Sequence, residues 1–209
     1  MDLLVILDNG HGGLVDGKYV TPGKRSPVWK DGTQLFEGVY NRLIVDKIVS
    51  GLSALGIQYS ILVKENEDIS LVTRVKRANE IHKANKDKKV ILCSVHVNAA
   101  VNPDGKGVEV FTTKGETQSD RLATIFIKYW TLYFGDTVKL RTDNRDGDPD
   151  KEENFYIIKY TLSPAFLSEN GFFTNEEECK KMLTSEWQQT VADVHIKTFE
   201  EYANLIKDL

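Results

Sequence analysis

Four side chains that can bind a metal ion or move a proton lie at the ends of apolar segments or at the start of a predicted helix. His11 lies in a glycine-rich turn and His96 at the end of an apolar run; Glu37 opens a predicted helix, and Glu169 follows a short apolar segment. Two histidines and one carboxylate, with one position left for water, form a typical catalytic zinc arrangement. The remaining carboxylate could then act as a general base. The pattern therefore predicts a hydrolytic site with one metal ion.

Each of these residues also has a purely structural interpretation. His11 could be an ordinary turn residue, and His96 could be a core histidine bonded to the backbone. Glu37 could simply favour the start of its helix, where a carboxylate interacts well with the helix dipole. The metal-site hypothesis gains weight only because one fold would bring all four residues together.

That fold follows from strands that alternate with helices. Continuous apolar runs predict buried strands at about 3–7, 57–63, 90–97 and 107–111, and a short strand at 165–167 that stops before Ser168. Helical periodicity predicts helices at about 36–54, at about 70–86, around 122–132 and in the C-terminal segment. We expect one α/β domain over residues 1–209, with a twisted, mostly parallel sheet flanked by helices on both faces. The active site should then lie at the carboxyl ends of the strands.

Two polar segments interrupt this pattern. The segment from Gly12 to Gln34 predicts a long loop, and loops of this length are usually functional or mobile. The acidic segment from Asp143 to Asn154 lacks the glycine and glutamate positions of an EF-hand, so we expect a solvated loop without calcium.

Composition excludes several classes of protein. The net charge of −4 argues against binding nucleic acid through bulk electrostatics. Two cysteines, Cys93 and Cys179, cannot form a disulfide framework. The first apolar run ends at Asp8, too soon for a signal peptide or a membrane span. We therefore expect synthesis in the cytoplasm, no stable membrane insertion and a monomer.

Five segments in consistent order carry a family resemblance. They are Leu7 to Gly13, Glu37 with Asn41, Ser94 to Ala99, Gly107 to Phe111, and Ser163 to Asn175 with Glu177. Together they make the chain resemble the zinc-dependent N-acetylmuramoyl-L-alanine amidases of the type-3 family.

The resemblance implies a role for each residue of the predicted site. It implies that His11, Glu37 and His96 bind one Zn²⁺ and that Glu169 is catalytic. It also implies that peptidoglycan is the substrate, cut at the amide between N-acetylmuramic acid and L-alanine.

Four further residues are predicted substrate contacts. Asn41 lies one helical turn after Glu37, and Asn98 lies two strand residues after His96. Lys24 and Arg25 lie in the long loop, where they could face an acidic group of the stem peptide.

Two alternatives stay open: a zinc amidohydrolase or peptidase that acts on a soluble peptide, and a non-catalytic wall-binding module. A substrate outside the membrane and the lack of an export signal fit an endolysin that reaches the wall after a holin-type breach of the membrane. A spore enzyme, a recycling enzyme or a chain without its leader would fit as well.

Overall fold

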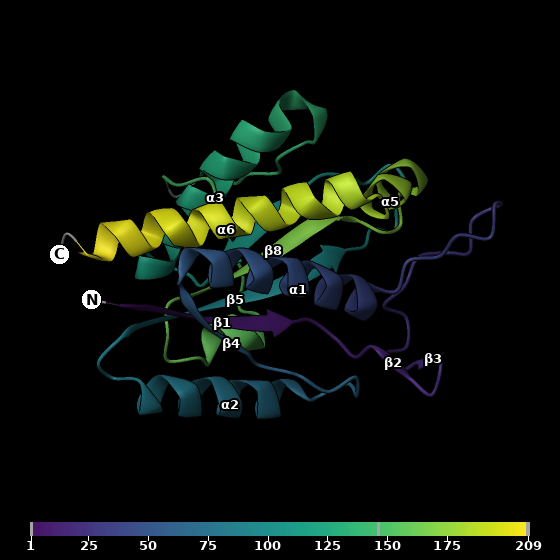
Figure 1. The fold of residues 1–209 in the computed structure, drawn as a ribbon. Coiled ribbons are helices and arrows are strands. Elements are labelled where there is room, and N and C mark those ends of the chain that lie inside the picture. Colours follow the sequence, from purple (N-terminus) through teal and green to yellow (C-terminus); the bar gives the residue numbers. More distant parts are fainter. Residues whose placement is uncertain (1, 146, 208–209) are drawn as a thin grey trace.

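The computed structural model describes residues 2–145 and 147–207, and a six-stranded sheet runs through its centre (Figure 1). The strand order is β4-β1-β5-β8-β6-β7, in which only the β6–β8 pair is antiparallel. The strands are β1 (Leu3–Asn9), β4 (Gln58–Ile61), β5 (Lys89–Asn98), β6 (Glu109–Thr112), β7 (Lys151–Glu152) and β8 (Ala165–Phe172). The predicted mostly parallel sheet is thus confirmed.

Helices cover both faces of this sheet. The helices α1 (Glu37–Leu55), α3 (Gln118–Phe134) and α6 (Ser185–Lys207) pack on one face, whereas α2 (Leu71–Ala84) and α4 (Tyr156–Lys159) pack on the other. The short elements are α5 (Glu176–Met182), the 3-10 helix Gly135–Thr137 and a hairpin of β2 (Leu14–Val15) and β3 (Lys18–Tyr19). Among the described residues, no helix is both long and apolar enough to cross a membrane.

The central strands are apolar throughout because both of their faces are buried. In β1, Leu3, Val5 and Leu7 point into the core beneath α1 and α6, while Leu4 and Ile6 point into the core beneath α2. A strand that alternates between two covered faces needs apolar residues at every position. The uninterrupted run in the sequence is a direct consequence of the three-layer arrangement.

Two expectations about local structure were wrong. The last strand does not stop before Ser168, because β8 pairs with β5 on one side and with β6 on the other through Glu169. These pairings satisfy the backbone of a polar segment that resembles a turn in sequence. The segment from Gly12 to Gln34 is not all loop either, since it contains the β2–β3 hairpin.

Candidate metal centre

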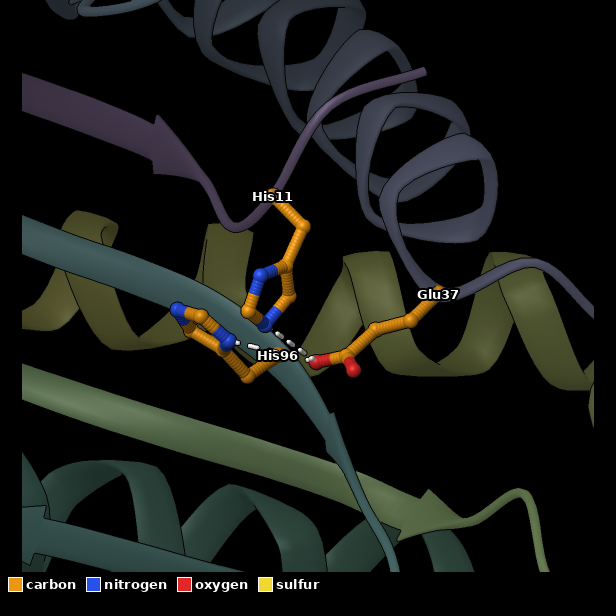
Figure 2. Close-up of side chains that lie close together, drawn as sticks. All are labelled: His11, Glu37 and His96. Atoms are coloured by element: carbon orange, nitrogen blue, oxygen red, sulfur yellow. Dashed lines mark hydrogen bonds and ion pairs between the residues drawn. The ribbon is translucent and has the colours of Figure 1, made fainter. Parts of the chain in front are cut away.

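The turn after β1 presents His11 toward the carboxyl edge of the sheet (Figure 2). His11 has a φ of 67°, a left-handed conformation that few residues other than glycine adopt. The turn also passes very close to His96: a Cβ atom at Gly10 would lie 2.2 Å from His96 Cε1. Glycine at position 10 therefore lets the backbone approach the second imidazole.

Glu37 brings its carboxylate between the two imidazoles from the start of α1. Its Oε1 lies 3.3 Å from His11 Nε2 and 3.2 Å from His96 Nδ1, and it accepts a hydrogen bond from the Val97 backbone N–H (3.2 Å). Only 1% of the Glu37 side chain is exposed. Burial alone would raise the pKa of this carboxyl, but His11 and His96 outweigh that effect and lower its pKa below the usual range.

His96 is held in one orientation by a chain of buried polar groups. The Ser94 hydroxyl donates to Asp8 Oδ2 (2.6 Å), so its oxygen is free to accept from His96 Nε2 (3.1 Å). Asp8 is in turn paired with Arg74, whose Nη1 lies 2.5 Å from Asp8 Oδ1. This chain places the ring proton on Nε2 and directs the Nδ1 lone pair toward Glu37.

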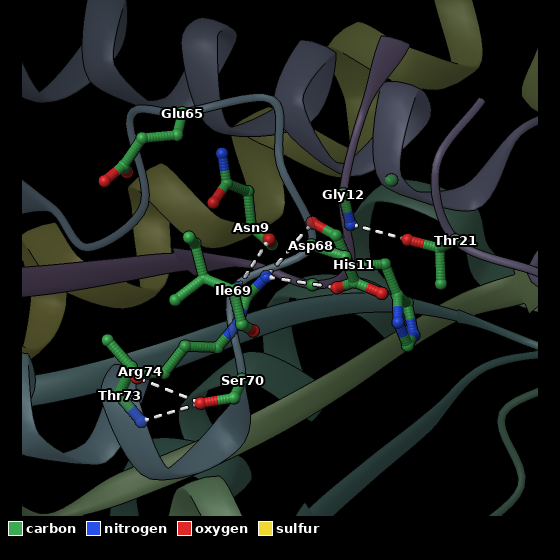
Figure 3. Close-up of polar contacts among 12 residues, drawn as sticks. Asn9, His11, Gly12, Thr21, Glu65, Asp68, Ile69, Ser70, Thr73 and Arg74 are labelled. Carbon is green, nitrogen blue, oxygen red and sulfur yellow. Dashed lines mark hydrogen bonds and ion pairs between the residues drawn. The ribbon is translucent and has the colours of Figure 1, made fainter. Parts of the chain in front are cut away.

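Arg74 also supports the turn that carries His11. Its guanidinium donates to the carbonyls of Asn9 (3.0 Å) and His11 (3.1 Å), as Figure 3 shows. In the same view Thr21 accepts a hydrogen bond from the Gly12 backbone N–H (2.8 Å). The strained turn is thereby fixed from the α2 side and from the β2–β3 side.

The three residues together fit a metal ion. One ligand atom from each of His11, Glu37 and His96 lies within 4.8 Å of the others. In this arrangement the His96 Nδ1 lone pair faces Glu37 Oε1, while His11 Nε2 and Glu37 Oε2 are buried without a hydrogen-bond partner. Facing acceptor atoms repel one another unless a proton or a cation lies between them. A zinc ion bound by two imidazoles and one carboxylate would relieve this repulsion.

Glu169 lies beside the three candidate ligands, in the interior of β8. Burial raises the pKa of its carboxyl to about 8, and the neighbouring Glu37 carboxylate adds to the increase. Its Oε2 is buried without a hydrogen-bond partner. A buried carboxyl with an unpaired oxygen next to a metal site can exchange a proton at near-neutral pH, and a bound cation would shift its pKa back down.

The four predicted substrate contacts fall in different environments. Asn41 is fully buried and donates to the Gly10 carbonyl (3.1 Å), so it supports the His11 turn from below. Lys24 is 46% exposed, and its Nζ lies 4.0 Å from Glu37 Oε2. Arg25 is exposed next to Lys24, and its backbone pairs with that of Phe36. Asn98 donates to Glu109 Oε2 (2.6 Å) beside Glu169.

Two cavities open next to this centre. One of about 290 Å³ lies between the His11 turn and the start of α2, and Asp8, Asp68 and Arg74 line it. The other, of about 520 Å³, extends from Glu169 and Asn98 along β6 and β7. The first cavity also reaches His11 and His96, so both cavities border the candidate metal centre.

Sequence reasoning missed the groups that support the centre. Asp8 and Ser94 were not singled out, although Ser94 is two strand residues before His96 and must share its face. Glu109 was also missed, and it accepts hydrogen bonds from Arg141 (2.7 Å) and Lys151 (2.5 Å) in the larger cavity. The sequence did contain a sign that Asp8 has a functional or supporting role, because a charged residue within an apolar strand is uncommon.

Comparison with known proteins agrees with this geometry. Residues 5–200 match the family described as N-acetylmuramoyl-L-alanine amidase. The endolysin of Bacillus phage SPP1 is 27% identical over 209 residues, which cover 99% of this chain and 68% of the endolysin. The protein YqiI of Bacillus subtilis (strain 168) is 26% identical over 198 residues, covering 95% of this chain and 84% of YqiI.

A solved structure shares the fold over nearly the whole chain. The N-acetylmuramoyl-L-alanine amidase of Clostridium difficile 630 superposes with a TM-score of 0.76 at 26% identity, covering 97% of each chain. The family match spans most of the sequence and includes every candidate ligand and Glu169. The chain therefore belongs to the N-acetylmuramoyl-L-alanine amidase family of type 3.

Proposed function

We propose that this enzyme is a zinc-dependent peptidoglycan amidase that hydrolyses the bond between N-acetylmuramic acid and L-alanine. The observation that carries the proposal is the convergence of His11, Glu37 and His96 within 4.8 Å, next to the buried carboxyl of Glu169. We further propose that residues 1–209 act as one catalytic domain and as a monomer. We also propose that the enzyme acts at the cell wall, which fits its likeness to the endolysin of Bacillus phage SPP1.

In this proposal each protein group has a defined task. His11, Glu37 and His96 hold the ion, which when bound polarises the scissile carbonyl and acidifies a water molecule. Glu169 accepts a proton from the attacking water on its carboxylate and then delivers that proton to the leaving amine of L-alanine. Ser94 and Asp8 keep the His96 ring in the tautomer that leaves Nδ1 free for the ion.

The test of this function is digestion of purified peptidoglycan by metal-depleted enzyme, with and without added zinc, followed by mass spectrometry. We expect zinc-dependent release of stem peptides that carry a free L-alanine amine. Release of other fragments, or equal release without zinc, would contradict the proposal. Zinc binding without any wall cleavage would favour a soluble peptide as the substrate.

Lys24 and Arg25 are proposed to contact an acidic group of the stem peptide. The Lys24 ammonium is half-exposed at the rim of the metal centre, and Arg25 is next to it on the surface. Exposed charge pairs contribute roughly 0.2–1 kcal/mol, so we expect the Lys24→Ala, Arg25→Ala double variant to raise KM several-fold with little change in kcat. Steady-state kinetics on the same peptidoglycan measures this. An unchanged KM in the double variant would remove both residues from the binding surface. The control is Lys159→Ala, which should leave KM at the wild-type value.

A further inference from the structure

A second group of carboxylates shares no residue with the candidate zinc centre. Asp120 is in the first turn of α3, whereas Asp148 and Asp150 lie in the segment before β7. One carboxylate oxygen from each lies within 4.8 Å of the others. The expectation of a solvated acidic segment was wrong for Asp150, which is only 1% exposed; Asp146 lies outside the described residues.

Asp150 has one oxygen that the protein leaves without a partner. Its Oδ2 accepts a hydrogen bond from the Thr112 hydroxyl (2.6 Å), but its Oδ1 is buried with none. Asp148 Oδ1 is also buried without a partner. An unpaired buried carboxylate oxygen is costly, and two of them in one cluster call for a positive charge or a proton between them.

Basic side chains near this segment are engaged with other carboxylates. Arg141 and Lys151 pair with Glu109, and Arg145 pairs with Asp143. Burial, together with the neighbouring Asp148 and Asp120 charges, raises the pKa of Asp150 to about 7. The three carboxylates therefore repel one another in a partly dry environment.

We propose that Asp120, Asp148 and Asp150 bind a divalent cation that prefers oxygen ligands, either Ca²⁺ or Mg²⁺. All three residues offer carboxylate oxygens, which are the ligands of hard cations, and no imidazole or thiolate of a zinc site is present among them. Ca²⁺ accepts an irregular set of six to eight oxygens, whereas Mg²⁺ demands an octahedron and retains water. The site should therefore bind Ca²⁺ and Mg²⁺ with different dissociation constants.

The position of this site gives the cation a structural task. Asp150 directly precedes Lys151, the first residue of β7, and Lys151 binds Glu109 in the larger cavity. Asp120 belongs to α3, which packs against β6 and β8. A cation shared by the three aspartates would fasten the segment before β7 to the start of α3, and so fix the wall of the cavity that leads to Glu169.

Calorimetric titration of the zinc-loaded protein with CaCl₂ and with MgCl₂ tests the site. We expect one of the two salts to bind with one-to-one stoichiometry. At about 100 times Kd it should raise Tm by roughly 5 °C or more. Asp150→Asn and, as the less buried alternative, Asp148→Asn should each weaken binding by at least about tenfold, because ligand charge sets the affinity of such sites. Asp136→Asn, at an exposed position in the 3-10 helix Gly135–Thr137 after α3, should bind as the wild type does.

Two results would overturn this proposal. One is the lack of any binding or Tm change with either salt at about 10⁻³ M, the weak limit for protein calcium sites. The other is wild-type binding by both Asp150→Asn and Asp148→Asn. If Asp150→Asn raises Tm while both salts have no effect, a shared proton, and not a cation, relieves the repulsion. Because cation binding and Tm are read without substrate, failure of the wall-cleavage assay leaves this test unaffected.

Discussion

Glu169→Ala should retain one bound zinc but lose turnover by roughly 10²–10⁴-fold, since positioned proton transfer contributes that much to catalysis. The carboxyl lies beside the ion site without being one of the three converging ligands. Removing it therefore leaves His11, Glu37 and His96 in place. Zinc content by atomic absorption and kcat on purified peptidoglycan measure the two effects separately.

Glu169→Gln is the matched variant for this experiment. It keeps the volume of the side chain within β8 but removes the group that accepts the proton, so it should lose turnover as Glu169→Ala does. A Gln variant with near wild-type kcat would show that Glu169 only fills space. Loss of zinc from both variants would instead make Glu169 a ligand.

His96→Ala is expected to lose both zinc and activity. The substitution removes one of three ligands and also leaves the Ser94 hydroxyl without its imidazole partner. Ser94→Ala keeps the ligand and removes only its support, so its zinc affinity should fall by about 10–100-fold. The loss in His96→Ala should exceed that value in a competitive chelator titration.

His82→Ala serves as the control for histidine loss. His82 lies on α2 and takes no part in the metal centre. Its Nδ1 is 2.8 Å from the Ser163 hydroxyl oxygen. Its zinc affinity should equal that of the wild type. Full zinc retention by His96→Ala, with His82→Ala unchanged, would contradict the assignment of His96 as a ligand.

The features that the sequence predicted best are those fixed by strong local patterns. The run from Leu3 to Leu7 predicted a strand buried on both faces, and α1 ends at Leu55, one residue after the expected end at about 54. The family segments predicted which four residues meet at the sheet edge, and three of them converge within 4.8 Å. Local periodicity was sufficient for the strand and for the end of the helix, whereas the site residues came from the family segments.

Features that depend on long-range pairing could not be read from local patterns. The polar segment around Glu169 forms a strand only because β5 and β6 satisfy its backbone from both sides. Asn41 shares a helix face with Glu37, and the sequence shows this. Its burial depends on a long-range contact, in which the Asn41 amide donates a hydrogen bond to the Gly10 carbonyl. Asp150 belongs to an acidic segment, yet Thr112, in a strand almost forty residues earlier, holds it in the interior.

The insertion of β8 between β5 and β6 has a consequence for how the enzyme forms during synthesis. The three candidate zinc ligands all precede β6 in the chain: His11 in the turn after β1, Glu37 on α1 and His96 on β5. Glu169 arrives only with β8, and until then β6 has no neighbour through which to join the sheet. On a ribosome, the three candidate ligands would thus emerge well before Glu169, the proposed proton-transfer group. If Glu169 has that role, the nascent chain gains activity only when one late strand completes the sheet.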